Sequence, residues 1–254
     1  MRSWTRLTRR GCPLHDSSTT VVHDRNGEAH AAHNPALLHH FAEPQQQRDA
    51  ASLGMWVFLA TEVMFFGGLF CAYLVYRQWY FGDFAAASKS INMRLGATNT
   101  AVLICSSLTV VLAVWAAQTA RRSLLIGSLA ITMLLGLTFL GIKGIEYRDK
   151  FVEHHVPGAS FSFENEPIPG HPGQYANARH AQMFFSLYFV MTGLHALHMI
   201  IGLGIFLWLL MMAWKGRFTP EWHTPVEIGG LYWHFVDIVW IYLFPLLYLI
   251  DRHP

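Results

Sequence analysis

Charged residues are scarce in this sequence. Only 13% of its 254 residues are Asp, Glu, Lys or Arg, while 53% are hydrophobic. A typical soluble domain has about 25% charged residues, so this chain lacks the polar shell that a soluble core of its size would need. The composition therefore excludes a soluble helical domain and points to a protein surrounded by lipid.

Several signals of secreted proteins and soluble enzymes are also missing. The three cysteines, Cys12, Cys71 and Cys105, form no CxxC motif, so no disulfide framework is expected. There is no phosphate-binding glycine loop, no serine nucleophile elbow and no inverted repeat of the kind found in many transporters. We also expect no cleavable signal peptide, because the first fifty residues are polar and the first apolar run is too long.

What the sequence does contain is five long apolar segments. Each is long enough to cross a hydrocarbon core about 30 Å thick, which takes about 20 helical residues. Backbone groups inside lipid must be satisfied within the segment, which favours helices. We therefore predict an all-α polytopic membrane protein, a bundle of five transmembrane helices. The predicted helices span residues 51–76, 97–119, 124–145, 183–212 and 229–250.

The distribution of Lys and Arg predicts the orientation of the chain. Basic residues precede the first helix, fill the turn between the second and third helices, and follow the fourth. Because basic loops stay on the cytoplasmic side, we predict a cytoplasmic N-terminus, a periplasmic C-terminus and an outer loop at residues 146–182. The residues concerned are Arg2, Arg6, Arg9, Arg10, Arg121, Arg122, Lys215 and Arg217.

The chain is predicted to divide into a polar cytoplasmic arm, residues 1–50, and a membrane domain, residues 51–254. The arm contains six histidines, which makes a metal-binding tail one interpretation. We favour a solvated arm, because no compact ligand spacing recurs. The histidines are His15, His23, His30, His33, His39 and His40.

Glu62 lies in the middle of the first apolar segment, within FLATEVMFFGGL, residues 58–69. An ionised acid at mid-bilayer costs about 3 kcal/mol on insertion scales, so this carboxyl group needs a partner on another helix. His195 and His198, in TGLHALHMIIG, share one helical face because they are spaced i, i+3. His198 lies near the midpoint of its segment, as Glu62 does. We predict a Glu62–His198 hydrogen bond, with His195 as the alternate partner.

The two histidines admit three interpretations. Metal or haem ligation is one, since imidazole suits Zn, Cu and Fe. However, two histidines on one helical face cannot hold a haem from both sides, and no cysteine or carboxylate cluster accompanies them. A proton relay through Glu62 is the second. Interhelical hydrogen bonding is the third and the one we favour; such bonds average about 0.6 kcal/mol, so the pair would specify packing more than supply stability.

A second polar group lies in YWHFVDIVW, residues 232–240, near the predicted cytoplasmic end of the last helix. His234 and Asp237 are spaced i, i+3 and can pair, and Glu227 lies just upstream. We predict that these three residues form an interfacial polar cluster that anchors the helix end. Trp233 is expected to belong to an aromatic belt and to contact lipid headgroups.

Three basic residues are also expected at lipid headgroups. Lys143 lies at the outer end of the third predicted helix, where its side chain can extend to the headgroups. Arg121 and Arg122 fill the tight inner turn and can hold a lipid phosphate.

Three motifs carry a family resemblance. TEVMFF, TGLHALHMIIG and GLYWHFVDIVW, in this order, closely resemble subunit III of haem-copper terminal oxidases, particularly bacterial cytochrome c oxidase. TNTAVLICSS and GIKGIEY also resemble the corresponding family segments, so the likeness runs from about residue 50 to the C-terminus. Many family members have two further helices before these five. The chain therefore resembles the shorter, five-helix bacterial form.

The resemblance implies an accessory, non-redox subunit of a proton-pumping complex in aerobic respiration, located in the bacterial plasma membrane. Haem and copper would belong to partner subunits, with no catalytic residue, metal or cofactor in this chain. Members of the family pack directly on subunit I and join subunit II and further subunits of the oxidase or a respiratory supercomplex. They bind phospholipid and support sustained proton uptake, and nucleic acid is not among the expected partners. Glu62 matches the family's carbodiimide-reactive glutamate, and the helix-four histidine matches its partner.

Three alternatives stay open at the level of sequence. A quinol oxidase, or a nitric-oxide-reductase-associated relative, would have an equivalent subunit, because the electron donor is chosen by another chain. From a different class, the chain is compatible with a small proton-conducting transporter centred on Glu62 and His198, or with a membrane haem or metal enzyme.

Overall fold

The structure is a computed structural model that describes residues 22–23, 29–30, 43–158, 161–163, 166–169, 171, 173–219 and 222–250. The chain forms two compact units, Met1–Gln47 and Arg48–Pro254. Of the first unit the structure describes a short antiparallel pair, β1 (Val22–His23) and β2 (Ala29–His30), in which Val22 is opposite His30. The side chains of the arm histidines, on which the metal-binding interpretation rests, lie outside the described part of the structure.

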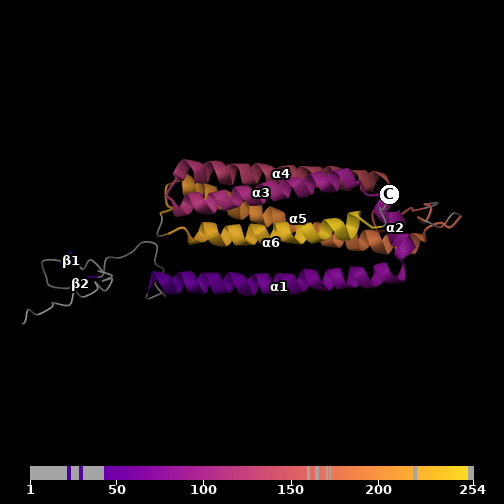
Figure 1. The fold of residues 1–254 in the computed structure, drawn as a ribbon, viewed down its shortest axis with the longest axis horizontal. Helices are drawn as coiled ribbons and strands as arrows, with labels where there is room; N and C mark the ends of the chain where they lie inside the picture. Colours follow the sequence, from indigo (N-terminus) through magenta and orange to yellow (C-terminus); the bar gives the residue numbers. More distant parts are fainter. Residues whose placement is uncertain are drawn as a thin grey trace, which may run out of the picture. The chain divides into compact units, whose positions relative to one another are not determined.

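The predicted all-α fold is confirmed, and within the described residues five helices are long and apolar enough to span a membrane (Figure 1). A short helix, α2, was not predicted; it follows the first span after a single residue. The helices are α1 (Pro44–Trp79), α2 (Phe81–Lys89), α3 (Met93–Gln118), α4 (Arg122–Val152), α5 (Ala178–Trp214) and α6 (Thr224–Tyr248).

Several helices extend beyond their predicted ends. Helix α4 continues to Val152, and α5 begins at Ala178, so the connection between them is shorter than the predicted loop of residues 146–182. A hydropathy window ends where polar residues begin, whereas the backbone can continue as a helix beyond the hydrocarbon. Side-chain caps mark two of the true starts: Asn92 accepts a hydrogen bond from the Arg94 amide at 3.0 Å, and Asn177 accepts one from the Arg179 amide at 2.9 Å.

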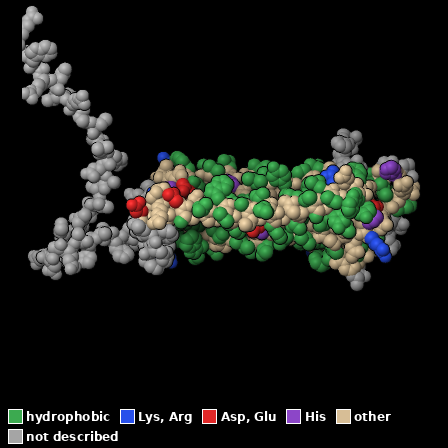
Figure 2. Space-filling model, turned by 90° about the horizontal axis from the view of Figure 1, so that it is seen from below, with side chains coloured by type: hydrophobic (Ala, Val, Ile, Leu, Met, Phe, Trp, Pro, Cys, Tyr) green, Lys and Arg blue, Asp and Glu red, His purple; other side chains and the backbone are tan. Residues whose placement is uncertain are grey.

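Helices α3, α4, α5 and α6 pack against one another as a bundle, with α3 against α4 and α6, and α5 against α4 and α6 (Figure 1). Helix α1 runs along this bundle and touches it through side chains. The space-filling view shows apolar side chains over most of the length of the helices, with charged residues mainly near the two ends (Figure 2). This distribution fits a protein whose middle is surrounded by lipid.

Candidate functional site

The Glu62 carboxyl group lies against His198, as the mid-span positions of the two residues suggested. Glu62 Oε2 is 3.2 Å from His198 Nε2, and both side chains are mostly buried, at 19% and 13% exposed. The other ring nitrogen, Nδ1, is 2.8 Å from the carbonyl oxygen of Leu194, one turn earlier in α5. The Phe66 ring covers the imidazole edge-on, at 5.4 Å between centroids. The pair therefore sits in an apolar setting between α1 and α5.

These two contacts determine where the protons of the pair lie. A carbonyl oxygen only accepts, so His198 Nδ1 must carry a hydrogen and donate it to Leu194. The hydrogen bond between Nε2 and Glu62 then contains one proton. Either a neutral Glu62 donates this proton to a neutral imidazole, or an imidazolium donates it to the Glu62 carboxylate. In both forms the pair as a whole is neutral, which suits its position within the membrane span.

Helix α1 is held to the bundle by a few large side chains in addition to Glu62. The Phe58 ring stacks on Tyr232 at 6.1 Å between centroids, and the Tyr73 hydroxyl donates to the Leu246 carbonyl at 2.7 Å. The opposite side of α1 is apolar and exposed, with Met64 at 78%. Only 17% of the most apolar part of α1 is buried, against 56% for α6. Loss of one of these contacts should therefore affect α1 more than a similar loss elsewhere.

His195, the alternate partner, is not in contact with Glu62. Its side chain is buried at 1% exposed, and its ring lies between Phe139 and Trp240, at 5.4 and 5.1 Å between centroids. Neither ring nitrogen has a hydrogen-bond partner among the described residues. The i, i+3 spacing put both histidines on one side of α5 but could not show which of them faces α1.

Lys143 is not a headgroup contact, and the prediction that it extends to the membrane surface is wrong. Its side chain is 4% exposed and donates three hydrogen bonds, to Glu146 Oε2 at 3.2 Å, to the Tyr188 hydroxyl at 3.1 Å and to the Tyr248 hydroxyl at 3.0 Å. Both tyrosines in turn donate to Glu146 Oε1, at 2.8 and 2.5 Å. The ammonium also lies 5.2 Å from the Trp240 ring centre.

This group, which we call the Lys143 cluster (Lys143, Glu146, Tyr188 and Tyr248), satisfies all three donors of the ammonium. It joins α4, α5 and α6 near one end of the bundle. The sequence contained one local signal, the i, i+3 spacing of Lys143 and Glu146. The tyrosines are 45 and 105 residues from Lys143, so no local pattern could have identified them.

Trp233 is fully buried, so its predicted contact with lipid headgroups is also wrong. Its indole N–H donates to Ser106 Oγ at 3.0 Å. Two glycines make room for the ring: a Cβ added to Gly136 of α4 would lie 2.8 Å from it, and one added to Gly202 of α5 would lie 3.1 Å from it. The prediction of an aromatic belt was wrong for Trp233 because its ring fills a space left open by Gly136 and Gly202, which are far from it in the sequence.

The predicted interfacial cluster of Glu227, His234 and Asp237 does not form. His234 and Asp237 lie in the middle of α6, and His234 Nδ1 is 2.8 Å from Ser107 Oγ rather than bonded to Asp237. The Asp237 carboxyl is buried and makes no hydrogen bond to His234. Glu227, two turns earlier, instead accepts from Gln118 Nε2 at 2.8 Å.

The two arginines of the α3–α4 turn have protein partners. Arg122 donates to the carbonyl oxygens of Ala213, at 3.1 Å, and Trp214, and so caps the C-terminal end of α5. The Arg121 guanidinium lies over the Trp115 ring, 4.8 Å from its centre. Both side chains are exposed, and binding of a lipid phosphate stays a prediction.

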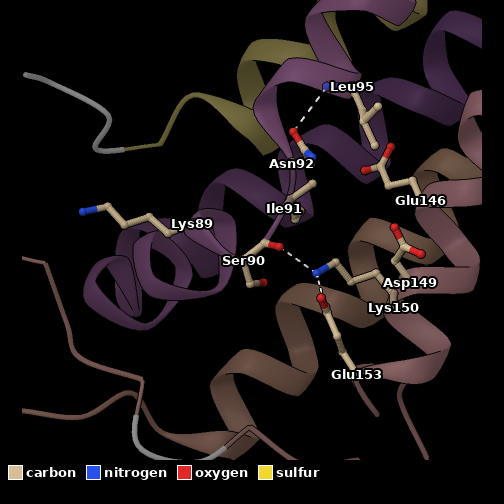
Figure 3. Close-up of a pocket in the computed structure, with 9 residues that line it drawn as sticks. All are labelled: Lys89, Ser90, Ile91, Asn92, Leu95, Glu146, Asp149, Lys150 and Glu153. Atoms are coloured by element: carbon tan, nitrogen blue, oxygen red, sulfur yellow. Dashed lines mark hydrogen bonds and ion pairs between the residues drawn. The ribbon is translucent and has the colours of Figure 1, made fainter.

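A polar pocket of about 280 Å³ lies where α2, α3 and α4 meet, beside the Lys143 cluster (Figure 3). Lys150 donates across it to the Ser90 carbonyl oxygen at 2.6 Å and to Glu153. The lining residues are Lys89, Ser90, Ile91, Asn92, Leu95, Glu146, Asp149, Lys150 and Glu153. Among the residues that the structure describes, no group of three His, Cys, Asp or Glu side chains could hold a metal ion.

His155, in the loop after α4, should make the packing of this loop sensitive to acid. Burial lowers the pKa of His155 from its ordinary value of 6.5, with the nearby Lys150 ammonium adding to the effect and Glu153 opposing it. The packed loop thus binds a proton less readily than the detached loop, so packing is favoured above pH 6.5 and is lost progressively as the pH falls below that value. We expect hydrogen exchange in residues 153–158 and 161–163 to be faster at pH 5.5 than at 7.5, after correction for intrinsic rates.

The control for this effect is His155→Phe, which keeps the stacking of the ring on Phe185, 5.1 Å away, but has no titratable group. The variant should show little pH dependence in the same segment. An unchanged pH dependence in the variant would mean that another group controls the loop.

Five membrane-spanning helices and a buried glutamate–histidine pair define a polytopic helical membrane protein. The family model described as cytochrome c oxidase subunit III matches residues 39–164 and 174–251. A probable cytochrome c oxidase subunit 3 from Nocardia farcinica (strain IFM 10152) is 34% identical over 199 residues, which cover 78% of this chain and 87% of the relative.

Two further relatives are similar to this chain over most of its length. Cytochrome c oxidase subunit 3 of Corynebacterium diphtheriae is 32% identical over 202 residues, 79% of this chain and 88% of the relative. That of Gallus gallus is 31% identical over 205 residues, 77% of this chain and 67% of the relative. The chain belongs to the cytochrome c oxidase subunit III family. It is thus a multi-pass plasma-membrane protein and a subunit of an oxidoreductase complex, which confirms the resemblance seen in its motifs.

Proposed function

We propose that this chain is an accessory subunit without redox centres that packs on subunit I of the oxidase, binds phospholipid and supports sustained proton uptake. The observation that carries the proposal is the way α1 is attached. One side of α1 meets the bundle through Glu62 and a few aromatic residues, while its other side presents exposed apolar residues such as Met64. A span so little buried by its own chain needs lipid or a neighbouring helix to cover it.

The Glu62–His198 pair fits a supporting role in proton uptake better than a carrier role. A carrier must release its proton and be reloaded, whereas here the proton bridges two side chains and Leu194 fixes the imidazole. Release would leave an unpaired carboxylate inside the membrane span, at a cost of about 3 kcal/mol. We therefore propose that the pair holds α1 in place. It thereby also maintains the contacts of that helix with lipid and with the neighbouring subunit. Haem and copper belong to the partner subunits in this proposal, and cytochrome c is the electron donor.

The test is to compare the complete oxidase with a complex from which this chain has been removed. Affinity purification of the chain in mild detergent should yield a haem-copper subunit I, seen by reduced-minus-oxidised spectra and peptide mass spectrometry. The depleted complex should begin with near-normal turnover, then lose activity during turnover and take up protons more slowly. Purification of this chain without a haem-bearing partner would contradict the proposal, as would identical proton uptake and lifetime in the two complexes.

A further inference from the structure

The pocket beside the Lys143 cluster reaches into the bundle. Helix α3 begins at Met93, and Leu95 in its first turn lines the pocket together with Glu146 of α4 (Figure 3). Glu146 is only 2% exposed and yet forms part of the pocket wall. One residue of the pocket wall is therefore the buried glutamate that pairs with Lys143.

Two polar side chains lie deeper in the bundle without partners. Asn99 is 0% exposed, and neither its amide nitrogen nor its oxygen has a hydrogen-bond partner among the described residues. His195 is 1% exposed, and neither of its ring nitrogens has a hydrogen-bond partner among the described residues. A buried polar atom without a partner gives up the hydrogen bonds that it makes to water in the unfolded chain and gains none in return. Groups of this kind in folded proteins are usually satisfied by ordered water.

The two side chains lie at the same depth as the ion pair. The hydroxyl groups of Thr109 and Thr132 are 2.7 Å apart and set the register of the antiparallel helices α3 and α4. Asn99 is ten residues before Thr109, which places it level with residue 142, next to Lys143. Asn99 is also one turn after Leu95, about 6 Å deeper than the pocket wall.

Trp240 of α6 links these groups on the other side. Its ring lies 5.1 Å from the His195 ring and 5.2 Å from the Lys143 ammonium. Its indole N–H donates to Thr100, the residue after Asn99, at 3.1 Å. His195 and Lys143 thus both lie at the Trp240 ring, and the indole N–H of this ring is bonded to the residue next to Asn99.

We propose that the pocket is the mouth of a narrow hydrated passage that enters the bundle past Glu146 and Lys143 and ends at Asn99 and His195, where it binds ordered water. Water at this level gives the two unpartnered side chains the hydrogen bonds that the protein does not provide. It also lets the Lys143 cluster exchange its protons with the aqueous phase at the pocket. The topology predicted from the basic residues places this mouth on the outer side of the membrane.

Cysteine scanning along α3 in the assembled oxidase tests the passage. Single cysteines replace Leu95, Asn99 or Leu103 in a background in which the three native cysteines are serine, and each variant is treated with a charged, membrane-impermeant methanethiosulfonate. These reagents attack thiolates, which form in water and not in hydrocarbon. We expect Leu95→Cys to react fast, Asn99→Cys to react more slowly but clearly, and Leu103→Cys not to react. Addition of His195→Phe should slow Asn99→Cys at least tenfold.

Ile104→Cys is the matched control, because Ile104 lies on the same helix and is 54% exposed on the lipid-facing surface. It should not react, which separates exposure to water from exposure to lipid. The passage is ruled out if Asn99→Cys reacts no faster than Ile104→Cys while the spectra show normal assembly, and equally if Leu95→Cys is unreactive.

A second measurement uses the unmodified residues. In ¹⁵N-labelled oxidase in lipid, water-edited solid-state NMR should transfer magnetisation from water to the His195 ring and the Asn99 amide rapidly. Assignment of the His195 signal follows from its loss in His195→Phe. Transfer as slow as that to the backbone amide of Ile104, in the lipid-facing middle of the same helix, would overturn the proposal even if no cysteine variant assembles.

Discussion

Replacement of Lys143 by methionine should destabilise the chain by about 3–5 kcal/mol, the usual cost of breaking a buried ion pair from one side. The substitution leaves the Glu146 carboxylate, 2% exposed, with only two tyrosine donors to offset its charge. Since the Lys143 cluster joins α4, α5 and α6, we expect a large fall in the thermal stability of the purified oxidase and in the yield of this chain.

Two further variants make the prediction specific. Lys143→Met combined with Glu146→Leu removes both charges and should recover much of the lost stability, because replacing a whole buried pair by apolar residues is often neutral. Lys150→Met makes the same change two turns later, but its partner Glu153 is 47% exposed and stays hydrated, so the loss should be much smaller. Equal losses of stability in Lys143→Met and in the double variant would show that the stability depends on the packing around Lys143 and not on its charge.

Glu62→Leu should reduce the yield of assembled chain several-fold, whereas Glu62→Gln should assemble nearly as wild type. A glutamine amide can donate to His198 Nε2, which accepts when Nδ1 donates to Leu194. Leucine leaves that nitrogen unpartnered inside the membrane span, a loss of about 1–3 kcal/mol. The effect falls on the attachment of α1, which depends on few other contacts. Co-purification with haem-bearing subunits measures assembly, and proton pumping is measured on the assembled complex.

The pair of variants separates packing from proton transfer. Equal yields of the leucine variant and wild type would count against a buried bond between Glu62 and His198. Complete loss of proton pumping in a fully assembled Glu62→Gln oxidase would show that the carboxyl group itself must carry a proton, because the amide keeps the hydrogen bond but cannot titrate.

The number of spans and the interhelical partner of Glu62 could be predicted because each depends only on where residues lie along the apolar segments. A run of apolar residues defines a span by its length, and a carboxyl group at mid-span needs a partner at the same depth. His198 satisfied that condition. The choice between His198 and His195 depends on how α5 is rotated relative to α1, which the positions along the segments do not determine.

Lys143 and Trp233 were assigned to the lipid surface for a common reason. The rules for helix ends describe side chains next to lipid and cannot show that other helices surround the end. Lys143 is enclosed by tyrosines from α5 and α6, and Trp233 fills a space beside Gly136 and Gly202. These contacts connect residues far apart in the chain, and only the packing of the helices reveals them.

The position of the proton between Glu62 and His198 tests the account most directly, because the attachment of α1 and the supporting role of the pair both depend on it. It can be measured by ¹⁵N solid-state NMR of histidine-labelled oxidase in lipid. We predict a His198 ring with a protonated Nδ1 and with Nε2 in a hydrogen bond that Glu62→Gln preserves and Glu62→Leu abolishes. A His198 ring with an unprotonated Nδ1, or an Nε2 signal that is the same in wild type and Glu62→Leu, would contradict the account.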